Sequence, residues 1–418
     1  MPAGPDSDEA ARSDASSPVF RPLSPDPVVI TSLTLTDFRS YQTAALAVRP
    51  GSTVFYGPNG AGKTNLLEAL SLFTPGKGLR TATASEMGRR EPGEAGGRPW
   101  AVTLTLADPL PGDEDEEPVR LGTGVPPGSS RRMVRINGET AQPGRLLDYL
   151  RPVWATPEQD RLFSDARAAR LKFFDRLVFA AQPSHANTVS VYERTLRERL
   201  RLLTEGAEGR AADPAWLDAL EARLSEAGAQ AVMARASALL ALQAGIDARS
   251  DRPFPQADLD LDGPAERMAA RGEDEGAIAT AIRSGLTASR VRDTASGRSL
   301  FGPHRTDLTA LHRQKNRPAA EGSSGEQKAL VLNLILAQIT RLRTESERTI
   351  APPILLLDEA PAHLDGDRRA ALFDEIETLK TTLGLQAFMT GTERTLFDGL
   401  NGRAAFVRVE GGGLVSDD

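Results

Sequence analysis

The residues best equipped for chemistry form a glycine-rich segment between an apolar stretch and a leucine-rich one. Positions 57–64 read Gly-Pro-Asn-Gly-Ala-Gly-Lys-Thr, which fits the phosphate-loop pattern G-x4-G-K-[ST]. STVFY precedes the segment as a predicted strand, and NLLEAL follows it as a predicted helix. Glycines let successive backbone N–H groups turn toward phosphate oxygens, and the helix N-terminus adds positive potential. This context favours a nucleotide-binding site over a chance glycine-rich turn.

The residue types of this segment indicate how it would hold a nucleotide. We expect Lys63 to reach the β- and γ-phosphates and to act in catalysis, and the Thr64 hydroxyl to ligate Mg²⁺. The predicted cofactors are therefore ATP and Mg²⁺. The other residues expected to line the nucleotide are Gly57, Pro58, Asn59, Gly60, Ala61, Gly62 and Asn65. Arg39 and Tyr41 are candidates for contact with adenine by their position alone.

A pair of carboxylates follows an apolar run near the other end of the chain. Ile354–Leu357 is apolar throughout, as expected of a strand buried on both faces of a parallel sheet. Asp358 and Glu359 come directly after it, at the strand end where α/β sheets bind their ligands. We expect Asp358 to hold Mg²⁺ and Glu359 to polarise the attacking water. A strand that ends in solvated acids is the alternative, which the phosphate loop disfavours.

A third segment, Ser323-Ser324-Gly325-Glu326-Gln327-Lys328, opens a predicted helix. Ser324 or Ser323 would cap this helix while Glu326 or Gln327 reaches back, and a plain cap is the alternative interpretation. However, SGEQK shortly upstream of ILLLDEA resembles the arrangement of ATP-binding-cassette (ABC) proteins. That resemblance implies that Ser324, Gly325 and Glu326 contact the γ-phosphate bound to a second subunit.

The same resemblance extends to loops around the carboxylates. Asp365 lies in a segment similar to the inter-subunit loop of ABC proteins, and Thr390 lies where a γ-phosphate sensor is expected. Gln159 is the candidate for the loop glutamine that senses Mg²⁺. His363 is expected to be an ordinary loop histidine, because Glu359 is better placed to act on water.

The spacing of these motifs predicts the organisation of the whole chain of 418 residues. The phosphate loop and the carboxylate strand lie in its outer thirds, and a Leu/Ala/Arg/Glu-rich helical region separates them. We therefore predict an α/β fold: an ABC-type P-loop ATPase head with an inserted helical arm subdomain. The expected parts are a disordered tail at 1–27, the head at 28–160 and 296–418, and the arm at 161–295.

Hydrophobic periodicity and turn residues predict the individual elements. Asp213 as cap and Pro214 at the first helical position predict one long helix over 214–248. Asn137-Gly138 predicts a hairpin turn, and 110–130 is expected to be loop. Further helices are expected over 264–292, 325–345 and 367–380. Strands are expected in VVITSLTLTDF, WAVTLTLAD, RMVRINGET, QADLDLDG, TDLTAL and LQAFMTGT, the last of these being the final core strand.

Nearly the whole chain after the tail resembles the RecF family of bacterial repair ATPases. The resemblance is carried by LTLTDFRSY, by FYGPNGAGKTNLLEALSLFTPGKGLR, by VWATPEQDRLFSD and by FGPHRTDL. It implies an ATP-dependent homodimer that binds DNA at gaps or stalled forks and supports recombinational repair and the SOS response. It further implies slow ATP hydrolysis that releases the complex, and RecR and RecO as partners.

Composition limits the alternatives. Zero cysteines exclude thiolate metal sites and thiol catalysis, and the tail lacks the apolar core of an export signal, which predicts a cytoplasmic protein without a membrane span. With 5% aromatic residues, DNA contact through duplex backbone or a junction is expected more than single-strand stacking. Two groups of arginines are candidates for DNA contact. We expect phosphate contacts from the arginines of head loops, which lack nearby acids, whereas the arginines of the second group are expected on a solvated helix face. The head-loop arginines are Arg80, Arg89, Arg90, Arg131, Arg132 and Arg135, and the second group is Arg194, Arg197, Arg199 and Arg201.

Three other classes of protein fit less well. A transporter's nucleotide-binding subunit or another ABC-type ATPase is the main alternative, but it would be shorter and would usually carry a histidine after the last core strand, where this chain reads Thr390-Gly391-Thr392. A nuclease with a similar head would need a metal-binding domain, and too few residues follow LQAFMTGT. An SMC-like structural protein would need a long coiled coil, and no heptad pattern persists.

Overall fold

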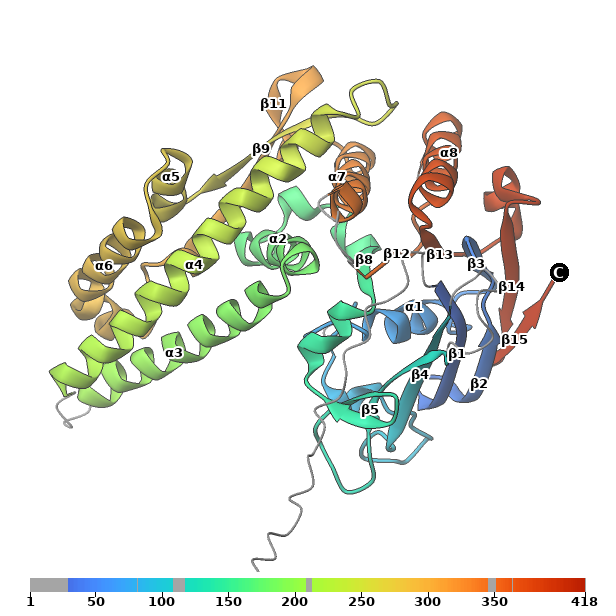
Figure 1. Ribbon diagram of the computed structural model, residues 1–418, viewed down its shortest axis with the longest axis horizontal. Helices are drawn as coiled ribbons and strands as arrows, with labels where there is room; N and C mark the ends of the chain where they lie inside the picture. Colours follow the sequence, from blue (N-terminus) through green and yellow to red (C-terminus); the bar gives the residue numbers. More distant parts are fainter. Residues whose placement is uncertain are drawn as a thin grey trace, which may run out of the picture.

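The computed structural model describes residues 29–80, 82–107, 117–207, 213–344, 351–362 and 364–417. The predicted tail at 1–27 and His363 lie outside the described residues. Figure 1 shows two parts, one built of sheets and one built of helices, with α7 and α8 beside the sheets.

The central sheet unites the two ends of the chain. Its order is β15-β14-β3-β13-β12-β8, and its neighbours are parallel except for β14 and β15. The strands are β3 (Ser52–Tyr56), β8 (Arg151–Ala155), β12 (Pro353–Leu357), β13 (Gln386–Gly391), β14 (Ala404–Glu410) and β15 (Gly413–Ser416). All residues of β8, β12 and β13 are buried, as expected of strands covered on both faces. The prediction that β13 is the final core strand was wrong, because β14 pairs with β3.

A second, antiparallel sheet packs on the other side of helix α1 (Lys63–Ser71). Its order is β2-β1-β4-β5-β6-β7, and its strands are β1 (Val29–Phe38), β2 (Tyr41–Ala47), β4 (Trp100–Ala107), β5 (Val119–Val125), β6 (Met133–Ile136) and β7 (Glu139–Ala141). Leu66, Leu67 and Leu70 of α1 share one apolar core with residues of both sheets. The core therefore fixes the start of α1 against the central sheet, where the phosphate loop enters it.

Two turn regions of this sheet show what local sequence could reveal. The hairpin turn at Asn137-Gly138 is confirmed, with φ of 50° and 87° between β6 and β7. The expectation of loop over 110–130 was wrong for β5. Its glycines disguised a strand, yet a Cβ on Gly124 would lie 2.2 Å from the Trp100 carbonyl oxygen. The glycine permits close pairing with β4 instead of marking a loop.

The inserted region is helical, as the sequence predicted. Its helices are α2 (Arg167–Ala181), α3 (Ser184–Ala207), α4 (Pro214–Asp247), α5 (Pro264–Ala270) and α6 (Glu275–Ser296). The long helix α4 and its Asp213 cap are confirmed, since the Asp213 carboxylate accepts from Ala215 N at 2.9 Å. The single helix expected over 264–292 was wrong. Gly272 adopts a φ of 81°, and Asp274 caps a new helix there.

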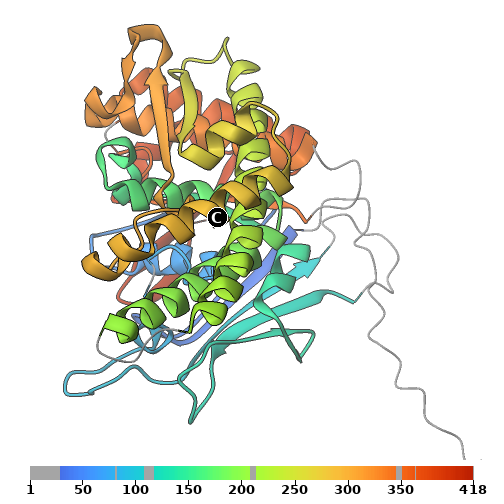
Figure 2. The ribbon, with the colours of Figure 1, turned by 90° about the vertical axis from the view of Figure 1, so that its left-hand side faces the viewer.

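The core of the insert contains an ion-pair network. Arg199 on α3 was expected on a solvated helix face, but its side chain is fully buried. It donates to Glu221 of α4 at 2.8 Å and to Asp293 of α6 at 2.7 Å. The prediction was wrong because α4 and α6 both pack on this face of α3, as Figure 2 shows with the helices in front.

A small sheet and two helices connect the insert to the central sheet. The sheet orders β11 (Arg317–Pro318), β10 (Asp307–His312) and β9 (Ala257–Asp262), all antiparallel. Helices α7 (Ser324–Thr344) and α8 (Gly366–Leu383) flank β12 in the sequence. The end of α4 rests on α7, where a Cβ on Gly245 would lie 3.3 Å from that of Ala337. Among the described helices, α4 alone has the length and composition to cross a membrane, and it is packed against α3, α6 and α7.

Candidate functional site

The phosphate loop joins β3 to α1 and is held in a form that depends on glycine. Gly57 and Gly62 have φ of 147° and 110°. A Cβ on Gly57 would lie 2.3 Å from the Val409 carbonyl oxygen, and one on Gly62 would lie 2.8 Å from the Tyr41 hydroxyl. Glycine is therefore required at both positions by backbone conformation and by space.

Lys63 points back over the loop from the first position of α1. Its Nζ donates to the carbonyl oxygens of Gly57 at 2.8 Å and Pro58 at 2.9 Å. Burial lowers the pKa of Lys63, while the nearby Glu359 and Asp358 act in the opposite direction. The ammonium group of Lys63 thus lies between the phosphate loop and the carboxylates of Asp358 and Glu359, which are far from it in the sequence.

The carboxylate strand and its neighbour meet the phosphate loop at one edge of the sheet. Asp358 Oδ1 accepts from the hydroxyl groups of Thr64 at 2.9 Å and Thr390 at 2.7 Å. The Thr390 hydroxyl in turn accepts from Glu359 N at 2.9 Å. β12 pairs with β13, which pairs with β3, so three strand ends bring these residues together with Lys63.

Glu359 has an unusual backbone conformation, with a φ of 51°. A left-handed conformation costs a residue with a side chain about 1 kcal/mol, and such strain is often found at functional sites. Its carbonyl oxygen accepts from Ala362 N at 3.1 Å, and its N–H is bound to Thr390. The turn after β12 is therefore fixed on both sides of Glu359.

The donors at this edge fit a nucleotide phosphate and a hard cation. Gly62 leaves the N-terminus of α1 without a side-chain cap, so its first N–H groups lack that partner. Space is open beside Gly60, where an added Cβ would meet nothing within 4 Å. The oxygens of Thr64 and Asp358 are the hard ligands that Mg²⁺ prefers. ATP and Mg²⁺ thus fit the residues present.

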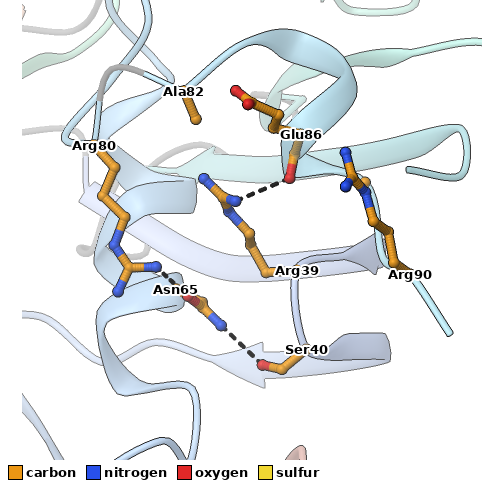
Figure 3. Close-up of a pocket in the computed structure, with 8 residues that line it drawn as sticks. Arg39, Ser40, Asn65, Arg80, Ala82, Glu86 and Arg90 are labelled. Carbon is orange, nitrogen blue, oxygen red and sulfur yellow. Dashed lines mark hydrogen bonds between the residues drawn. The ribbon is translucent and has the colours of Figure 1, made fainter. Parts of the chain in front are cut away.

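A cavity of about 900 Å³ opens beside the phosphate loop (Figure 3). Asn65 lies at its border, donating to Ser40 Oγ at 2.9 Å and accepting from Arg80 at 2.9 Å. Arg39 lines the cavity and is held by Glu68 and by the Glu86 carbonyl oxygen at 2.9 Å. Its position suits a nucleoside that extends from the loop.

Tyr41 has a different environment from Arg39, although both were candidates for adenine contact. The Tyr41 ring is fully buried, and its hydroxyl donates to the Gly62 carbonyl oxygen at 3.1 Å. Burial raises the pKa of Tyr41. Tyr41 thus supports the phosphate loop through its bond to Gly62. Of these two residues, only Arg39 lines the cavity.

The third motif begins α7 with a capping box. Ser323 is the capping residue: Glu326 N donates to its hydroxyl at 3.4 Å, and Ser323 N donates to Glu326 Oε2 at 2.9 Å. Glu326 also pairs with Lys315 and Arg317, and the Lys315 bond contributes most to lowering its pKa to about 2. None of the hydrogen bonds described for Ser324, Gly325 and Glu326 reaches the phosphate loop. The hydrogen bonds described for these three residues thus stay within the segment around the start of α7.

Two other predicted residues cap local turns. The Asp365 carboxylate accepts from Arg368 N at 2.8 Å at the start of α8. Gln159 lies in the turn after β8, and its side-chain oxygen accepts from Thr156 N at 3.3 Å. Neither side chain contacts Thr64 or Asp358 among the hydrogen bonds described. The remaining phosphate-loop residues, Pro58, Asn59 and Ala61, lie in the turn between β3 and α1.

One residue of this site, the last of the third segment, received no role from the sequence. Lys328 is 4% exposed, and its Nζ donates to the Glu359 carbonyl oxygen at 3.3 Å. The available signal was a lysine at the head of KALVLNLILA, where all the following residues except Asn333 are apolar. A charged group in such a run needs a polar partner inside the protein.

The arginines considered for DNA contact divide into two groups. The expectation that the head loops lack nearby acids was wrong for Arg89, which pairs with Glu91 at 3.0 Å, and for Arg80, which lies 3.7 Å from Glu68. In the part of the chain that the structure describes, exposed Arg90, Arg131 and Arg135 have no carboxylate within 4 Å. These three remain available for phosphate contact.

Comparison with known proteins places the chain among ATPase heads of the SMC type. The model of the RecF/RecN/SMC N terminal domain matches residues 29–411. The chain is 57% identical to the DNA replication and repair protein RecF of Caulobacter sp. (strain K31), over 93% of this chain and 98% of that protein. It is 56% identical to the RecF of Caulobacter vibrioides, with the same coverage. The chain belongs to the RecF family.

Solved structures confirm the predicted fold class. The structure of the recombination mediator protein RecF-ATPrS in the RecFOR pathway has a TM-score of 0.79, at 22% identity over 94% of this chain and 99% of the other. That of RecF-ATP in the same pathway has a TM-score of 0.75, at 21% identity over 93% and 99%. The fold is that of an α/β ABC-type ATPase head, and the RecF reading is favoured over a transporter subunit.

Proposed function

We propose that this chain is a RecF-type DNA replication and repair protein that dimerises when it binds ATP. Its dimer would hold DNA at gaps or stalled forks, and ATP hydrolysis would release it. The observation that carries this proposal is the convergence of Lys63, Thr64, Asp358, Glu359 and Thr390 at one edge of the central sheet. Sequence-distant groups gathered in this way match the requirements of phosphoryl transfer.

Nucleotide binding would use groups that now bond to the loop itself. Lys63 Nζ would exchange the Gly57 and Pro58 carbonyl oxygens for oxygens of the β- and γ-phosphates. Thr64 and Asp358 would hold Mg²⁺, which neutralises phosphate charge, and Gln159 would approach it from the neighbouring turn. The cavity lined by Arg39 and Asn65 would take the nucleoside.

Hydrolysis would depend on the orientation of Glu359. Its carboxylate would accept a hydrogen bond from the attacking water and direct it at the γ-phosphorus. Thr390 would sense the γ-phosphate through its bonds to Asp358 and to Glu359 N. Slow turnover suits a switch, because the bound state then persists long enough to act on DNA.

Dimerisation would complete the site. Because SGEQK resembles the segment that ABC proteins place on a partner's nucleotide, we infer that Ser324, Gly325 and Glu326 close over the nucleotide of a second copy, with Asp365 beside them. ATP bound across two interfaces stabilises the dimer and not the monomer, so affinity between subunits rises with ATP occupancy.

The remaining assignments follow from the family. We propose duplex or junction DNA as the ligand of the head surface around Arg131 and Arg135, RecR and RecO as partners, and a cytoplasmic location. We also propose the division into a head (28–160 and 296–418) and an arm (161–295). Two copies side by side would double the DNA contacts and raise avidity.

Light scattering of Glu359→Gln tests the switch. We expect a monomer without ATP, a dimer with ATP and Mg²⁺, and retention of duplex DNA by the dimer only. Ser324→Arg in the same background should abolish the dimer, because a large cation blocks close approach. Ser250→Arg, at an exposed serine after α4, is the matched control and should dimerise normally. A protein that stays monomeric with ATP and ignores DNA would contradict the proposal.

A further inference from the structure

Lys328 joins three segments at the centre of the head. It lies on α7, one helical turn after Ser324, and its side chain is almost completely buried. Its Nζ donates to Asp160 Oδ2 at 3.1 Å and to the carbonyl oxygens of Ala362 at 3.0 Å and Glu359 at 3.3 Å. These three bonds use the three hydrogens of one ammonium group.

The contact with Glu359 bears on the geometry of the carboxylate. The N–H of Glu359 is held by Thr390 Oγ1, and its carbonyl oxygen accepts from both Ala362 N and Lys328 Nζ. With the peptide groups on both sides fixed, the direction of the Cα–Cβ bond is fixed as well. This matters at a φ of 51°, because a residue with a side chain leaves that conformation unless its surroundings hold it.

The position of Lys328 on α7 gives it a second role. Ser324 and Lys328 are separated by four positions and therefore lie on the same face of the helix. Any displacement of the α7 start is transmitted to the Glu359 carbonyl oxygen through a side chain with little room to move. Asp160 anchors the same ammonium to the turn after β8.

A neighbouring bond reinforces this connection. Gln327 Nε2 donates to Ser164 Oγ at 2.7 Å, and Ser164 Oγ donates to the Ala320 carbonyl oxygen at 3.0 Å. These two bonds connect the residues around the start of α7 to the turn region after β8. Among these connecting residues, Lys328 is the one that bonds to the turn after β12, which contains Glu359.

We propose that Lys328 is a positioning residue that sets the direction of the Glu359 carboxylate by holding its backbone carbonyl oxygen. It links the α7 start, which would close on the nucleotide of a second copy, to the hydrolytic site of its own chain. This inference rests on the proposed ATPase function and adds a residue that acts through Glu359 without touching the nucleotide.

Steady-state ATP hydrolysis by Lys328→Met, Lys328→Arg and Lys380→Met tests the proposal. Methionine keeps the length of the side chain and removes its donors. We expect kcat to fall at least about tenfold in Lys328→Met, with KM for ATP unchanged within about twofold, since a transition-state interaction is lost and ground-state binding is not. Lys328→Arg retains donors and should recover most of the activity.

The control is a lysine with similar partners far from the site. Lys380 on α8 donates to Glu377 at 2.8 Å and to the Arg403 carbonyl oxygen at 3.3 Å, so Lys380→Met should keep the kcat of the unmodified chain. A general loss of packing would lower both methionine variants and would not be rescued by arginine.

The outcomes separate the inference from the proposed function. An unmodified chain that neither binds nor hydrolyses ATP contradicts the proposed function itself. An active chain whose folded Lys328→Met variant keeps its kcat, or changes only KM, overturns the role of Lys328. If circular dichroism shows that Lys328→Met is unfolded, Lys328→Gln decides by the same criterion, because its amide is too short to reach both carbonyl oxygens.

Discussion

Thr390 touches both members of the acidic pair through a single hydroxyl group. It donates to Asp358 Oδ1 at 2.7 Å and accepts from Glu359 N at 2.9 Å, although it comes from the neighbouring strand β13. Because the side chain is fully buried, no water can replace these bonds without rearrangement. The relative position of the two acids therefore depends on the end of β13.

Replacing this hydroxyl should impair hydrolysis more than binding. Thr390→Val keeps the shape of the side chain, but leaves Glu359 N and one Asp358 bond unsatisfied, at a cost of about 1–3 kcal/mol in folding stability. We expect kcat for ATP hydrolysis to fall roughly tenfold or more. Thr390→Ser keeps the hydroxyl and should stay near the unmodified rate. Equal rates for the two variants would show that the bonds are dispensable.

Loss of the phosphate-loop lysine should abolish nucleotide binding without unfolding the protein. In Lys63→Met, two hydrogen bonds to loop carbonyl oxygens are lost, and the loop keeps its glycine-dependent form. Equilibrium dialysis with ATP should show at least about a hundredfold weaker binding, in line with removal of a charge-assisted contact. Lys77→Met, at an exposed lysine of the following loop, is the control and should bind normally. Normal ATP affinity in Lys63→Met would remove the loop from the site.

The buried network of Arg199 should dominate the stability of the helical insert. Arg199→Met leaves Glu221 and Asp293 without one of their cationic partners, and breaking a buried pair costs about 3–5 kcal/mol. Arg201→Met, two residues along the same helix, removes only an exposed pair with Glu205 and should cost less than about 1 kcal/mol. Urea unfolding followed by circular dichroism compares them. Similar midpoints would contradict the network's importance.

Acid should weaken the contact of α2 with α4 through Asp175. Burial raises the pKa of Asp175, but Arg235 at 2.7 Å and His185 at 2.8 Å lower it further, to about 2 from an ordinary 3.8. A lowered acid pKa stabilises the fold above about pH 4, and this contribution is lost as the pH falls toward 2. Linkage gives a loss of about 1 kcal/mol by pH 3.

The comparison of Asp175→Asn with the unmodified chain isolates this effect. The variant should be less stable at pH 7, and the gap in unfolding free energy should narrow by about 1 kcal/mol between pH 5 and pH 3. Asp374→Asn removes an exposed partner of Arg403 and should show a constant gap. A gap that stays constant for Asp175→Asn as well would contradict the lowered pKa.

DNA binding should depend on the arginines without carboxylate partners. Arg131→Ala with Arg135→Ala should weaken ATP-dependent duplex binding for every sequence, and should reduce the slope of log affinity against log salt by about 2. Arg197→Ala with Arg201→Ala removes two arginines already paired with Glu193 and Glu205, and serves as the control. Fluorescence anisotropy over a salt series gives both slopes. If Arg131→Ala with Arg135→Ala gives the same salt slope as the control variant, the DNA binds at another surface of the protein.

The sequence allowed prediction of features that depend on local pattern. The phosphate loop, the carboxylate strand and the capped helix α4 each carry their signal within a short segment, and all appear where expected. Features set by distant partners could not be predicted. Gly124 disguised β5 because its close approach to the neighbouring strand is invisible in one segment, and Arg199 looked solvated because α4 and α6 cover it. Lys328 likewise has meaning only beside the Glu359 carbonyl oxygen.

The contact of Gly245 with Ala337 makes α4 a lever. The helix has 34 residues, so it extends about 51 Å, from the outer end of the insert beside α3 to the surface of α7. Because the glycine lets the two helices approach closely, the end of α4 is held against α7 at Ala337, on the same helix whose start would close on a second copy. A tilt of about 10° at Gly245 carries the far end through roughly 8 Å. A small rotation of α7 on closure would therefore produce a larger displacement at the outer end of α4, and a force applied at that end would act back on α7.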